Sequence, residues 1–433
     1  MNLKNKRVLV YGLGQSGRAV VKVLREHLAH VSFFDDNVKL WDQIGFERDP
    51  LNKKYDFVIV SPGVKCKGNL LLKKLQRTSA IVMSELDFGY LLSRGKVVAI
   101  TGTNGKTTTC MLVYNILKSA GYDAFLCGNI GLPISAIAEK TTNKSILVCE
   151  VSNFQLELSQ FFHANIACVL NIKPDHLDRH GSFDEYKRCK SKIVQNMKHK
   201  DVLILNLDDD KTRCLSLHKN FEYFTKGVIK RGTYIANNYI FTNKKPMLPL
   251  KAIKLRGEKN LENVLAAVSI CSHFKVNAKV IEQAVSKFVP AQHRMEIVGS
   301  AKGVTYVDDS KATNVASTVS CLEAFQNESV ILLLGGVGKE DSYDEIFLTK
   351  NKIKCVVCFG KDREKFAVAS KMRGYKTFVC DKFETAVVKA HKLAVEEDFV
   401  LLSPACASFD EFVNYAERGD KFQEIVVGFV NEK

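Results

Sequence analysis

Short apolar runs alternate with amphipathic stretches along the chain. In the N-terminal part, residues 7–11, 31–34 and 57–60 predict strands, and residues 18–27 predict a helix between the first two. These runs hold few polar residues, which is typical of strands that are buried on both faces of a sheet. Strands that alternate with helices favour a parallel sheet with right-handed crossover connections.

The same alternation continues toward the C-terminus. A strand at residues 96–100 and a helix at 108–120 open a second region, and Pro290 separates it from a third. Residues 219–249 are polar and rich in β-forming residues, which predicts a small antiparallel hairpin region. Further strands are predicted at residues 145–149, 166–171, 202–207, 304–308, 330–335, 355–360 and 399–403, and further helices at 260–274 and 278–288.

This organisation predicts an α/β protein of three domains, each an open and mostly parallel sheet with flanking helices. We place a Rossmann-like domain at residues 1–92, a P-loop-type domain at 93–291 and a second Rossmann-like domain at 292–433. The length of 433 residues agrees with this division, because domains of about 150 residues are common.

Composition narrows the class of protein. Hydrophobic residues make up 46% of the chain and charged residues 25%, which excludes a mainly disordered protein. The net charge of 63 − 47 = +16 indicates an anionic partner, namely nucleic acid, a phosphorylated metabolite or an acidic surface, unless it reflects background composition. Because Lys and Arg are scattered over all three regions, we expect no nucleic-acid partner.

Cysteine usage and hydropathy predict a cytoplasmic protein. The thirteen cysteines show no compact spacing pattern, which is typical of reduced thiols in the cytosol. No apolar stretch reaches 18 residues, so we expect no membrane span. Lys4, Lys6 and Arg7 precede only a four- or five-residue apolar run, so we expect no signal peptide.

Three glycines follow the first predicted strand. Gly12, Gly14 and Gly17 have the spacing of a dinucleotide-binding fingerprint, and Asp35 lies 35 − 17 = 18 residues further on. Such glycines let the backbone approach a pyrophosphate at a helix N-terminus. From these residues alone, a nicotinamide cofactor and another nucleotide diphosphate are equally good interpretations, and a purely structural turn is a third.

A second glycine-containing loop, residues 102–107 (GTNGKT), carries a stronger signal. It lies between a predicted strand and a predicted helix, so its amides can wrap phosphate oxygens, Lys106 can reach the β- and γ-phosphates, and Thr107 can bind Mg²⁺. Ile100 replaces the glycine that opens a conventional P-loop, so the loop is a shorter variant. Two phosphate-binding loops indicate two nucleotides: one that is a bound part of the substrate and another that is the energy source.

Glu150 and His176 are candidate metal ligands of the second region. Glu150 directly follows the predicted strand at 145–149, and His176 follows the strand at 166–171, in a segment that also holds Asp175 and Asp178. Open parallel sheets place their sites just beyond the carboxyl ends of the strands. We therefore predict that the Glu150 and His176 side chains bind a divalent metal ion.

The motifs together resemble the Mur ligases along nearly the whole chain and, within that family, the members that add D-glutamate. The resemblance rests on residues 102–107 (GTNGKT), 127–131 (CGNIG), 150–156 (EVSNFQL), 174–179 (PDHLDR), 293–294 (HR), 309–314 (DSKATN), 335–339 (GGVGK) and 403–408 (SPACAS).

The resemblance implies an ATP-dependent ligase that adds D-glutamate to UDP-N-acetylmuramoyl-L-alanine in peptidoglycan precursor synthesis. ATP would phosphorylate the substrate carboxylate, because a free carboxylate does not accept an amine at neutral pH. The amine of D-glutamate would then attack the acyl phosphate. The resemblance further implies Mg²⁺ or Mn²⁺ as the metal and a monomer as the assembly.

The resemblance also implies roles for residues of this sequence. The catalytic set is Lys106, Glu150, His176 and Lys190, and the metal ligands are Thr107, Glu150, His176 and, if carbamylated, Lys190. ATP would contact Gly102, Thr103, Asn104, Gly105, Lys106, Thr107, Thr108, Asn263, Arg294 and Asp309. The UDP substrate would contact Gly14, Gln15, Ser16, Asp35, Asp36, Gly63, Asn129 and Ser152, and D-glutamate would contact Lys311, Thr313, Lys339, Ser408, Phe409 and Tyr415.

Four residues, in three places, depart from the usual family pattern. Asn153 stands where serine is common, Asp36-Asn37 replaces a Thr-Arg pair, and Val337 replaces a frequent acidic residue. The second change removes a cation that could meet the uridine diphosphate.

Two other enzyme classes explain less of the chain. A nicotinamide-dependent dehydrogenase leaves the Lys106 loop and the Glu150 and His176 pair unexplained. A folylpolyglutamate-type ligase shares the ATP domain but gives no reason for a separate fingerprint domain.

Overall fold

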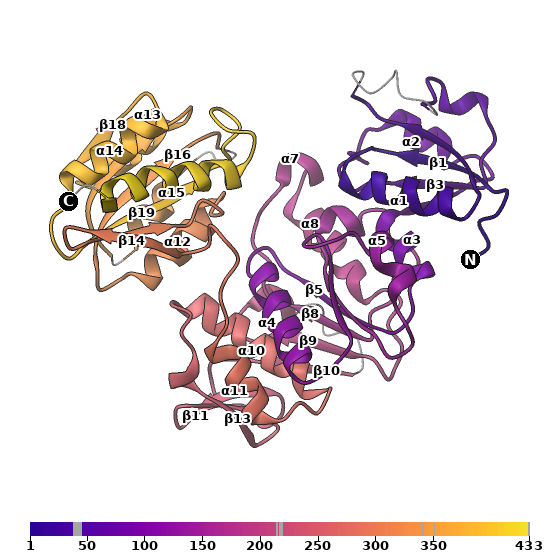
Figure 1. The fold of residues 1–433 in the computed structure, drawn as a ribbon, viewed down its shortest axis with the longest axis horizontal. Coiled ribbons are helices and arrows are strands. Elements are labelled where there is room, and N and C mark those ends of the chain that lie inside the picture. The colour runs from indigo at the N-terminus through magenta and orange to yellow at the C-terminus, as the bar shows by residue number, and fades with distance from the viewer. Residues whose placement is uncertain (38–45, 214, 216–219, 339–341, 350, 432–433) are drawn as a thin grey trace. The chain divides into compact units, whose positions relative to one another are not determined.

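The computed structural model describes residues 1–433 except 38–45, 214, 216–219, 339–341, 350 and 432–433. Contacts divide the chain into two compact units. Unit 1 comprises residues 1–254 and 262–288, and unit 2 comprises residues 255–261 and 289–433. Unit 1 holds two sheets and unit 2 holds one (Figure 1).

The first sheet of unit 1 is four-stranded and parallel, in the order β2-β1-β3-β4. Alternate residues of its strands point to opposite faces, so Val8 and Val10 pack with α1 while Leu9 packs with α2. The strands are β1 (Arg7–Tyr11), β2 (His30–Phe34), β3 (Phe57–Val60) and β4 (Ile81–Ser84), and the helices are α1 (Gln15–Glu26), α2 (Leu70–Leu75) and α3 (Glu85–Leu92).

The second sheet of unit 1 has nine strands in the order β13-β12-β11-β10-β9-β8-β5-β7-β6. It is parallel from β6 to β11, and β12 and β13 join its far edge as antiparallel strands. The strands are β5 (Lys96–Thr101), β6 (Ala124–Gly128), β7 (Ile146–Glu150), β8 (Ile166–Val169), β9 (Val202–Asn206), β10 (Phe221–Phe224), β11 (Thr233–Ala236), β12 (Tyr239–Thr242) and β13 (Lys245–Pro249). The helices are α4 (Lys106–Ser119), α5 (Ile134–Ile137), α6 (Asn153–Leu156), α7 (Leu177–His180), α8 (Phe183–Ser191), α9 (Asp210–Arg213), α10 (Glu258–Ser272) and α11 (Ala278–Ser286).

The sheet of unit 2 has the order β14-β15-β19-β16-β17-β18, and only its edge strand β14 is antiparallel. Helices α12 and α13 cover one face of this sheet, and Leu332 of β16 packs against them. Helices α14 and α15 cover the other face, where Leu333 of β16 packs. The strands are β14 (Glu296–Ala301), β15 (Val304–Asp308), β16 (Ser329–Gly335), β17 (Lys352–Phe359), β18 (Thr377–Val379) and β19 (Asp398–Ala405), and the helices are α12 (Val315–Ala324), α13 (Arg363–Met372), α14 (Phe383–Leu393) and α15 (Tyr415–Asn431).

The predicted α/β class with mostly parallel sheets is confirmed. Residues 219–249 were expected to form a small hairpin region; from β11 onward they do so, as an extension of the central sheet rather than a separate element. The central helix begins at Lys106 rather than at residue 108, so the end of the phosphate loop forms its first turn. The domain boundaries at residues 92 and 291 stay a prediction.

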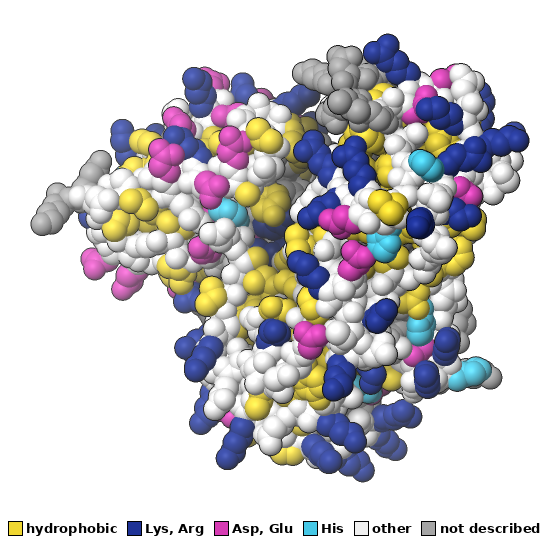
Figure 2. Space-filling model, turned by 45° about the vertical axis from the view of Figure 1, so that its right-hand side comes forward, with side chains coloured by type: hydrophobic (Ala, Val, Ile, Leu, Met, Phe, Trp, Pro, Cys, Tyr) yellow, Lys and Arg dark blue, Asp and Glu magenta, His cyan; other side chains and the backbone are white. Residues whose placement is uncertain are grey.

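The surface and the cysteines agree with the composition. Every described cysteine is free, and all of these except Cys66 are buried. Lys and Arg side chains are spread over the face shown in Figure 2 rather than gathered into one patch. Among the helices that the structure describes, none combines the length and apolar character needed to cross a bilayer.

Candidate active site

The predicted phosphate loop connects β5 to α4. Gly105 has φ = 85°, and a Cβ at this position would lie 2.2 Å from Oδ1 of Asn263, so glycine is required. The Asn104 N–H donates to Oδ1 of Asn171 (2.9 Å), and Nδ2 of Asn171 donates to the Asn104 carbonyl (3.0 Å). Asn171 therefore fixes the path of the loop, and Asn263 lies directly against it.

Two lysines converge on the carbonyl of Gly102 in this loop. Nζ of Lys106 donates to the carbonyls of Gly102 (2.9 Å) and Thr103 (2.8 Å). Nζ of Lys190, from α8, donates to the same Gly102 oxygen at 2.9 Å. Burial, with the charge of Lys106 as the next cause, lowers the pKa of Lys190 well below the usual lysine range. Lys190 is thus suited to act as a neutral amine.

Glu150 gathers oxygen-bearing groups at the end of β7. Its side chain is buried, with Oε2 accepting a hydrogen bond from Oγ1 of Thr107 (2.8 Å) and Oε1 accepting one from Nδ2 of Asn129 (2.7 Å). The carboxylate of Glu150 and the hydroxyl of Thr107 are oxygen donors of the kind that Mg²⁺ and Mn²⁺ prefer. The residues present therefore fit the predicted metal, and the phosphate loop supplies one of them.

His176 lies in a short loop just before α7. Its backbone is left-handed (φ = 52°), and its N–H donates to Oδ1 of Asp175 at 2.8 Å. The imidazole packs edge-on against Phe154, with 4.7 Å between ring centroids, and the guanidinium of Arg179 lies 4.1 Å from the same Phe154 ring centroid. An aromatic side chain and a carboxylate thus hold His176 in place.

Asn153, one of the residues that depart from the family pattern, contacts His180. Asn153 is buried at the start of α6, and its Nδ2 lies 2.5 Å from Nε2 of His180. The preceding Ser152 caps the same helix by accepting a hydrogen bond from the Gln155 N–H (3.3 Å). An amide at position 153 therefore serves to join α6 to α7.

The fingerprint glycines are required by close packing between β1 and α1. Gly12 has φ = 92°, and its carbonyl accepts a hydrogen bond from Oγ of Ser61 at 2.6 Å. A Cβ on Gly17 would lie 1.8 Å from that same carbonyl oxygen. A Cβ on Gly14 would meet no atom within 4 Å, so this glycine faces open space at the N-cap of α1. Gln15 and Ser16 follow as the first residues of the helix.

Asp35 and Asp36, which follow β2, accept hydrogen bonds from nearby residues of the N-terminal sheet region. Asp35 accepts the N–H of Leu13 through Oδ2 (2.6 Å) and the N–H of Asn37 through Oδ1 (2.9 Å). Both carboxylate oxygens of Asp36 lie 3.0 Å from the hydroxyl of Tyr11, which donates to them. Gly63 is exposed in the loop after β3. The six N-terminal residues predicted for the UDP substrate thus follow three adjacent strands, whereas Asn129 and Ser152 belong to the central sheet.

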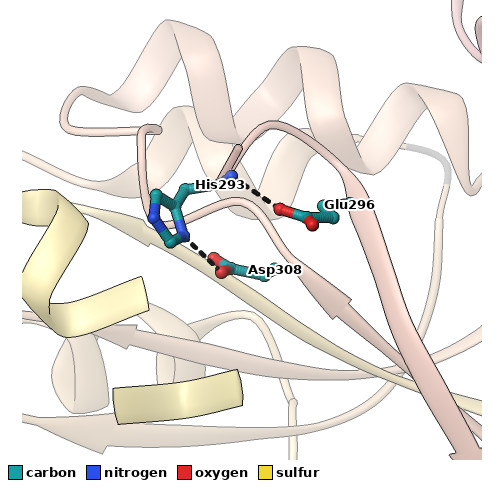
Figure 3. Close-up of side chains that lie close together, drawn as sticks. All are labelled: His293, Glu296 and Asp308. Atoms are coloured by element: carbon teal, nitrogen blue, oxygen red, sulfur yellow. Dashed lines mark hydrogen bonds and ion pairs between the residues drawn. The ribbon is translucent and has the colours of Figure 1, made fainter. Parts of the chain in front are cut away.

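His293, Glu296 and Asp308 form a cluster in unit 2 whose ligand-type atoms lie within 4.8 Å of one another (Figure 3). Nδ1 of His293 contacts Oδ2 of Asp308 at 2.7 Å, and the His293 N–H donates to Oε2 of Glu296 at 2.9 Å. Nε2 of Gln423 donates to both carboxylates. The hydrogen bond to Asp308 raises the pKa of His293. Because each carboxylate already has donors, we interpret the cluster as a clamp between the 293–296 segment and β15.

Arg294 and Asp309, which are predicted to bind ATP, directly follow His293 and Asp308 of the clamp in the sequence. The N–H of Met295 donates to Oδ1 of Asp309 (3.3 Å), and Oγ of Ser403 donates to Oδ2 (2.9 Å). Burial raises the pKa of Asp309 to about 7. Hydrogen bonds with Cys321 and Ser403, and then the charge of Arg294, partly oppose this effect. Asp309 is therefore a carboxyl group poised between its two protonation states near neutral pH.

The residues predicted for D-glutamate follow three strands of unit 2. Nζ of Lys311 lies 3.5 Å from the ring centroid of Tyr415, and the N–H of Thr313 donates to the Lys311 carbonyl. Ser408 is buried, and Phe409 beside it is 73% exposed. Lys339 lies outside the described residues.

The structure thus brings Lys106, Thr107, Glu150 and Lys190 to one loop and Lys311 and Tyr415 into contact. Two structural features of these regions were not predicted. Asn171 holds the phosphate loop, and Arg418 is fully buried in α15. Asn171 was identifiable, because it follows a strand at the end where parallel sheets carry their sites. Arg418 gave no such signal, because an arginine on an amphipathic helix is normally exposed.

Comparison with protein families matches most of the chain. Residues 100–271 match the Mur ligase middle domain, and residues 293–406 match the Mur ligase glutamate ligase domain. Proteins named UDP-N-acetylmuramoylalanine–D-glutamate ligase are similar over their whole length. The one from Caldicellulosiruptor bescii is 38% identical over 98% of both chains, and that from Caldanaerobacter subterraneus subsp. tengcongensis is 34% identical over 99% of both.

Solved structures show the same fold at lower identity. A pseudomurein peptide ligase type C from Methanothermus fervidus has a TM-score of 0.63 at 20% identity, covering 98% of this chain and 100% of its own. MurF ligase from Thermotoga maritima in complex with ADP has a TM-score of 0.63 at 15% identity, covering 99% of this chain and 96% of its own.

Proposed function

The chain belongs to the Mur ligase family, and from this membership we propose that it joins D-glutamate to UDP-N-acetylmuramoyl-L-alanine with ATP as the energy source. The observation that carries the proposal is the full-length similarity to ligases named for this reaction. The chain is accordingly an ATP-dependent, amide-bond-forming enzyme of peptidoglycan synthesis.

In the first half-reaction, the phosphate loop holds ATP. The loop amides and Lys106 bind the phosphates, and Lys106 moves from the Gly102 and Thr103 carbonyls to the γ-phosphoryl group, which needs a cation as its charge shifts. Thr107, Glu150 and His176 would hold Mg²⁺, or Mn²⁺ in its place. The metal would supply positive charge at the phosphate oxygens. A carboxylate oxygen of the UDP substrate attacks phosphorus, and ADP leaves with the electron pair of the broken bond.

Lys190 is proposed to become a metal ligand by carbamylation. Its suppressed pKa leaves a neutral amine, which can attack carbon dioxide to form an N–C bond with loss of a proton. The product is a carbamate anion beside Lys106. Native mass spectrometry in bicarbonate should show the sequence mass plus one carbon dioxide for the parent protein and the sequence mass alone for Lys190→Arg; the sequence mass alone for both proteins would contradict the modification.

In the second half-reaction, D-glutamate occupies the pocket of unit 2. Lys311 and Lys339 pair with its carboxylates, while Thr313, Ser408, Phe409 and Tyr415 line the remainder of the pocket. The amine attacks the acyl carbon, the tetrahedral intermediate expels phosphate, and the nitrogen releases its proton to solvent. Asn263, Arg294 and Asp309 hold the nucleotide during this step.

The N-terminal domain, residues 1–92, is proposed to hold the UDP end of the substrate. Gly14 leaves open space at the N-cap of α1, where a diphosphate meets the partial positive charge of the helix. Gln15, Ser16, Asp35, Asp36 and Gly63 surround this position, and Asn129 and Ser152 meet the muramoyl-alanine part. Within this proposal the protein acts as a cytoplasmic monomer.

The direct test is release of ADP with components omitted one at a time. We expect turnover only when UDP-N-acetylmuramoyl-L-alanine, D-glutamate, ATP and Mg²⁺ are all present. Turnover with L-lysine or diaminopimelate in place of D-glutamate would contradict the choice of amino acid. Tight binding of NADH without binding of the UDP substrate would instead favour the dehydrogenase interpretation.

A further inference from the structure

Arg418, in the first turns of α15, is among the largest fully buried side chains of the protein. Nε donates to Oγ of Ser310 (2.9 Å), and Nη2 donates to the carbonyls of Ser310 (2.9 Å) and Cys406 (3.1 Å). Nη1 donates to the carbonyl of Gly335 at 3.4 Å. The Ser310 hydroxyl in turn donates to the Tyr415 carbonyl (2.8 Å), which ties the start of α15 into the same network.

The acceptors of this guanidinium are neutral oxygens among the described residues. Burial lowers the pKa of Arg418 to about 10, which leaves it charged at neutral pH. A buried charge whose hydrogen-bond partners are neutral costs stability relative to an apolar side chain of the same size. The carboxylates of Asp410, Asp308 and Glu411 offset only part of this cost, because the pKa of Arg418 is still lowered. Stability alone therefore does not account for an arginine here.

The three acceptor residues lie at the carboxyl ends of neighbouring strands. The sheet order places β15, β19 and β16 side by side, and Ser310, Cys406 and Gly335 lie at or just beyond their ends. Each contact is close in sequence to a residue of the proposed D-glutamate pocket. Ser310 precedes Lys311, Cys406 lies two residues before Ser408, and Gly335 lies four residues before Lys339.

The backbone of these loops needs such support. Gly335 and Gly336 have φ of 156° and 122°, and Ala405 has φ = 60°, a left-handed conformation that costs energy for a residue with a side chain. The Val337 N–H donates to the Ala407 carbonyl, and the Ala407 N–H donates back, which joins two of the loops directly. The guanidinium completes the connection by adding the third.

We propose that Arg418 is a positioning residue for the amino-acid substrate: it holds the three pocket loops in register. This inference rests on the proposed function, because the pocket assignment comes from it. Arg418 reaches the substrate only through the loops that it joins. Its loss should therefore affect binding of the amino acid more than binding of ATP.

The test compares Arg418→Met and Arg418→Lys with Arg373→Met, which removes an exposed arginine just after α13. Steady-state kinetics give KM for each substrate and kcat. We expect Arg418→Met to raise KM for D-glutamate about tenfold or more while KM for ATP changes less than about twofold, since several charge-assisted hydrogen bonds are lost. Arg418→Lys should lie between, and Arg373→Met should match the parent protein. Equal changes in both KM values, or a change in neither, would overturn the inference.

A second measurement separates this inference from the proposed function. Hydrogen exchange of the amides in residues 309–313, 335–338 and 405–412 reports the loops without any turnover. Faster exchange in all three segments of Arg418→Met supports the positioning role, and unchanged exchange refutes it. If Arg418→Met fails to fold, Arg418→Lys decides by the same two readouts. If the parent protein shows no D-glutamate-dependent ADP release, the proposed function fails, while the exchange data still decide whether Arg418 orders the loops.

Discussion

The proposed phosphate loop of unit 1 and the proposed amino-acid pocket of unit 2 are organised in opposite ways. In unit 1, several charged side chains meet around one backbone loop, with Lys106 and Lys190 on the Gly102 carbonyl and Glu150 on Thr107. In unit 2, one buried charge, Arg418, meets several backbone loops. The first arrangement concentrates chemistry at one point, and the second distributes support over a surface. Substitutions should therefore act on the chemical step in unit 1 and on substrate fit or stability in unit 2.

The largest effect is expected at Lys106. Lys106→Ala should lower kcat by about a thousandfold or more, because the γ-phosphoryl group loses its neutralising cation. Binding of UDP-N-acetylmuramoyl-L-alanine, measured by calorimetry, should stay nearly unchanged. Lys118→Ala, in the last turn of the same helix, is the matched control and should behave as the parent protein does. Equal loss of turnover and of UDP-substrate binding would show that the two loops do not have separate roles.

Glu150 should show the next largest effect. Glu150→Gln keeps the side-chain shape but removes the charge, and we expect activity to fall about a hundredfold, with more Mg²⁺ needed for half-maximal rate. Titration of the ADP-release assay with Mg²⁺ measures both values. Glu26→Gln on α1 serves as the control for a surface carboxylate. An unchanged Mg²⁺ requirement would remove Glu150 from the metal site.

In unit 2, a methyl group at Gly419 tests how tightly α15 packs on the clamp. A Cβ there would lie 2.1 Å from Nδ1 of His293, so Gly419→Ala should destabilise the protein by roughly 1–3 kcal/mol through overpacking. Gly428→Ala on the same helix meets no atom within 4 Å and should be neutral or stabilising. Denaturant unfolding followed by circular dichroism compares the two. Similar stabilities for both variants would contradict the packing of His293 against α15.

Asp309 should give the smallest effect, a dependence of stability on pH. Its folded-state pKa is about 7, above the unfolded value, so the folded protein binds more protons and loses stability as pH rises toward 7. Between about pH 6 and pH 8 this loss amounts to about 1.4 kcal/mol, and Asp309→Asn should remove it. Thermal unfolding of both proteins at the two pH values measures it, with the exposed Asp381→Asn as control. Parallel pH profiles for Asp309→Asn and the parent protein would exclude a raised pKa.

The sequence predicted unit 1 better than unit 2, for a physical reason. The phosphate loop needs Gly105 for its backbone and Lys106 for its charge, and these requirements fall on neighbouring residues. A short motif therefore carries most of the geometry. The parallel core strands were likewise predictable, because strands buried on both faces are continuously apolar.

Features that depend on distant residues were missed. Strands β4, β6, β14 and β18 were not predicted. Each of them lies at an edge of its sheet, where the continuous apolar run of a central strand is not required. The contacts of Arg418 join residues that are 12 to 108 positions apart in the sequence. No local pattern marks such contacts. The Asn153 departure was identified, but its partner His180 became evident only when α6 and α7 were placed together.

The choice of main-chain acceptors by Arg418 has a consequence for evolution. Three of its four hydrogen bonds end on carbonyl oxygens, which every residue type possesses. Apart from Ser310, whose hydroxyl accepts the fourth hydrogen bond, side chains of these loops can therefore be exchanged without loss of the contacts to Arg418. The amino-acid preference of such a pocket can change through side-chain substitutions while the backbone of its loops stays the same. Libraries that vary Thr313, Ser408 and Phe409 but keep Arg418 offer a direct way to select ligases with altered preference.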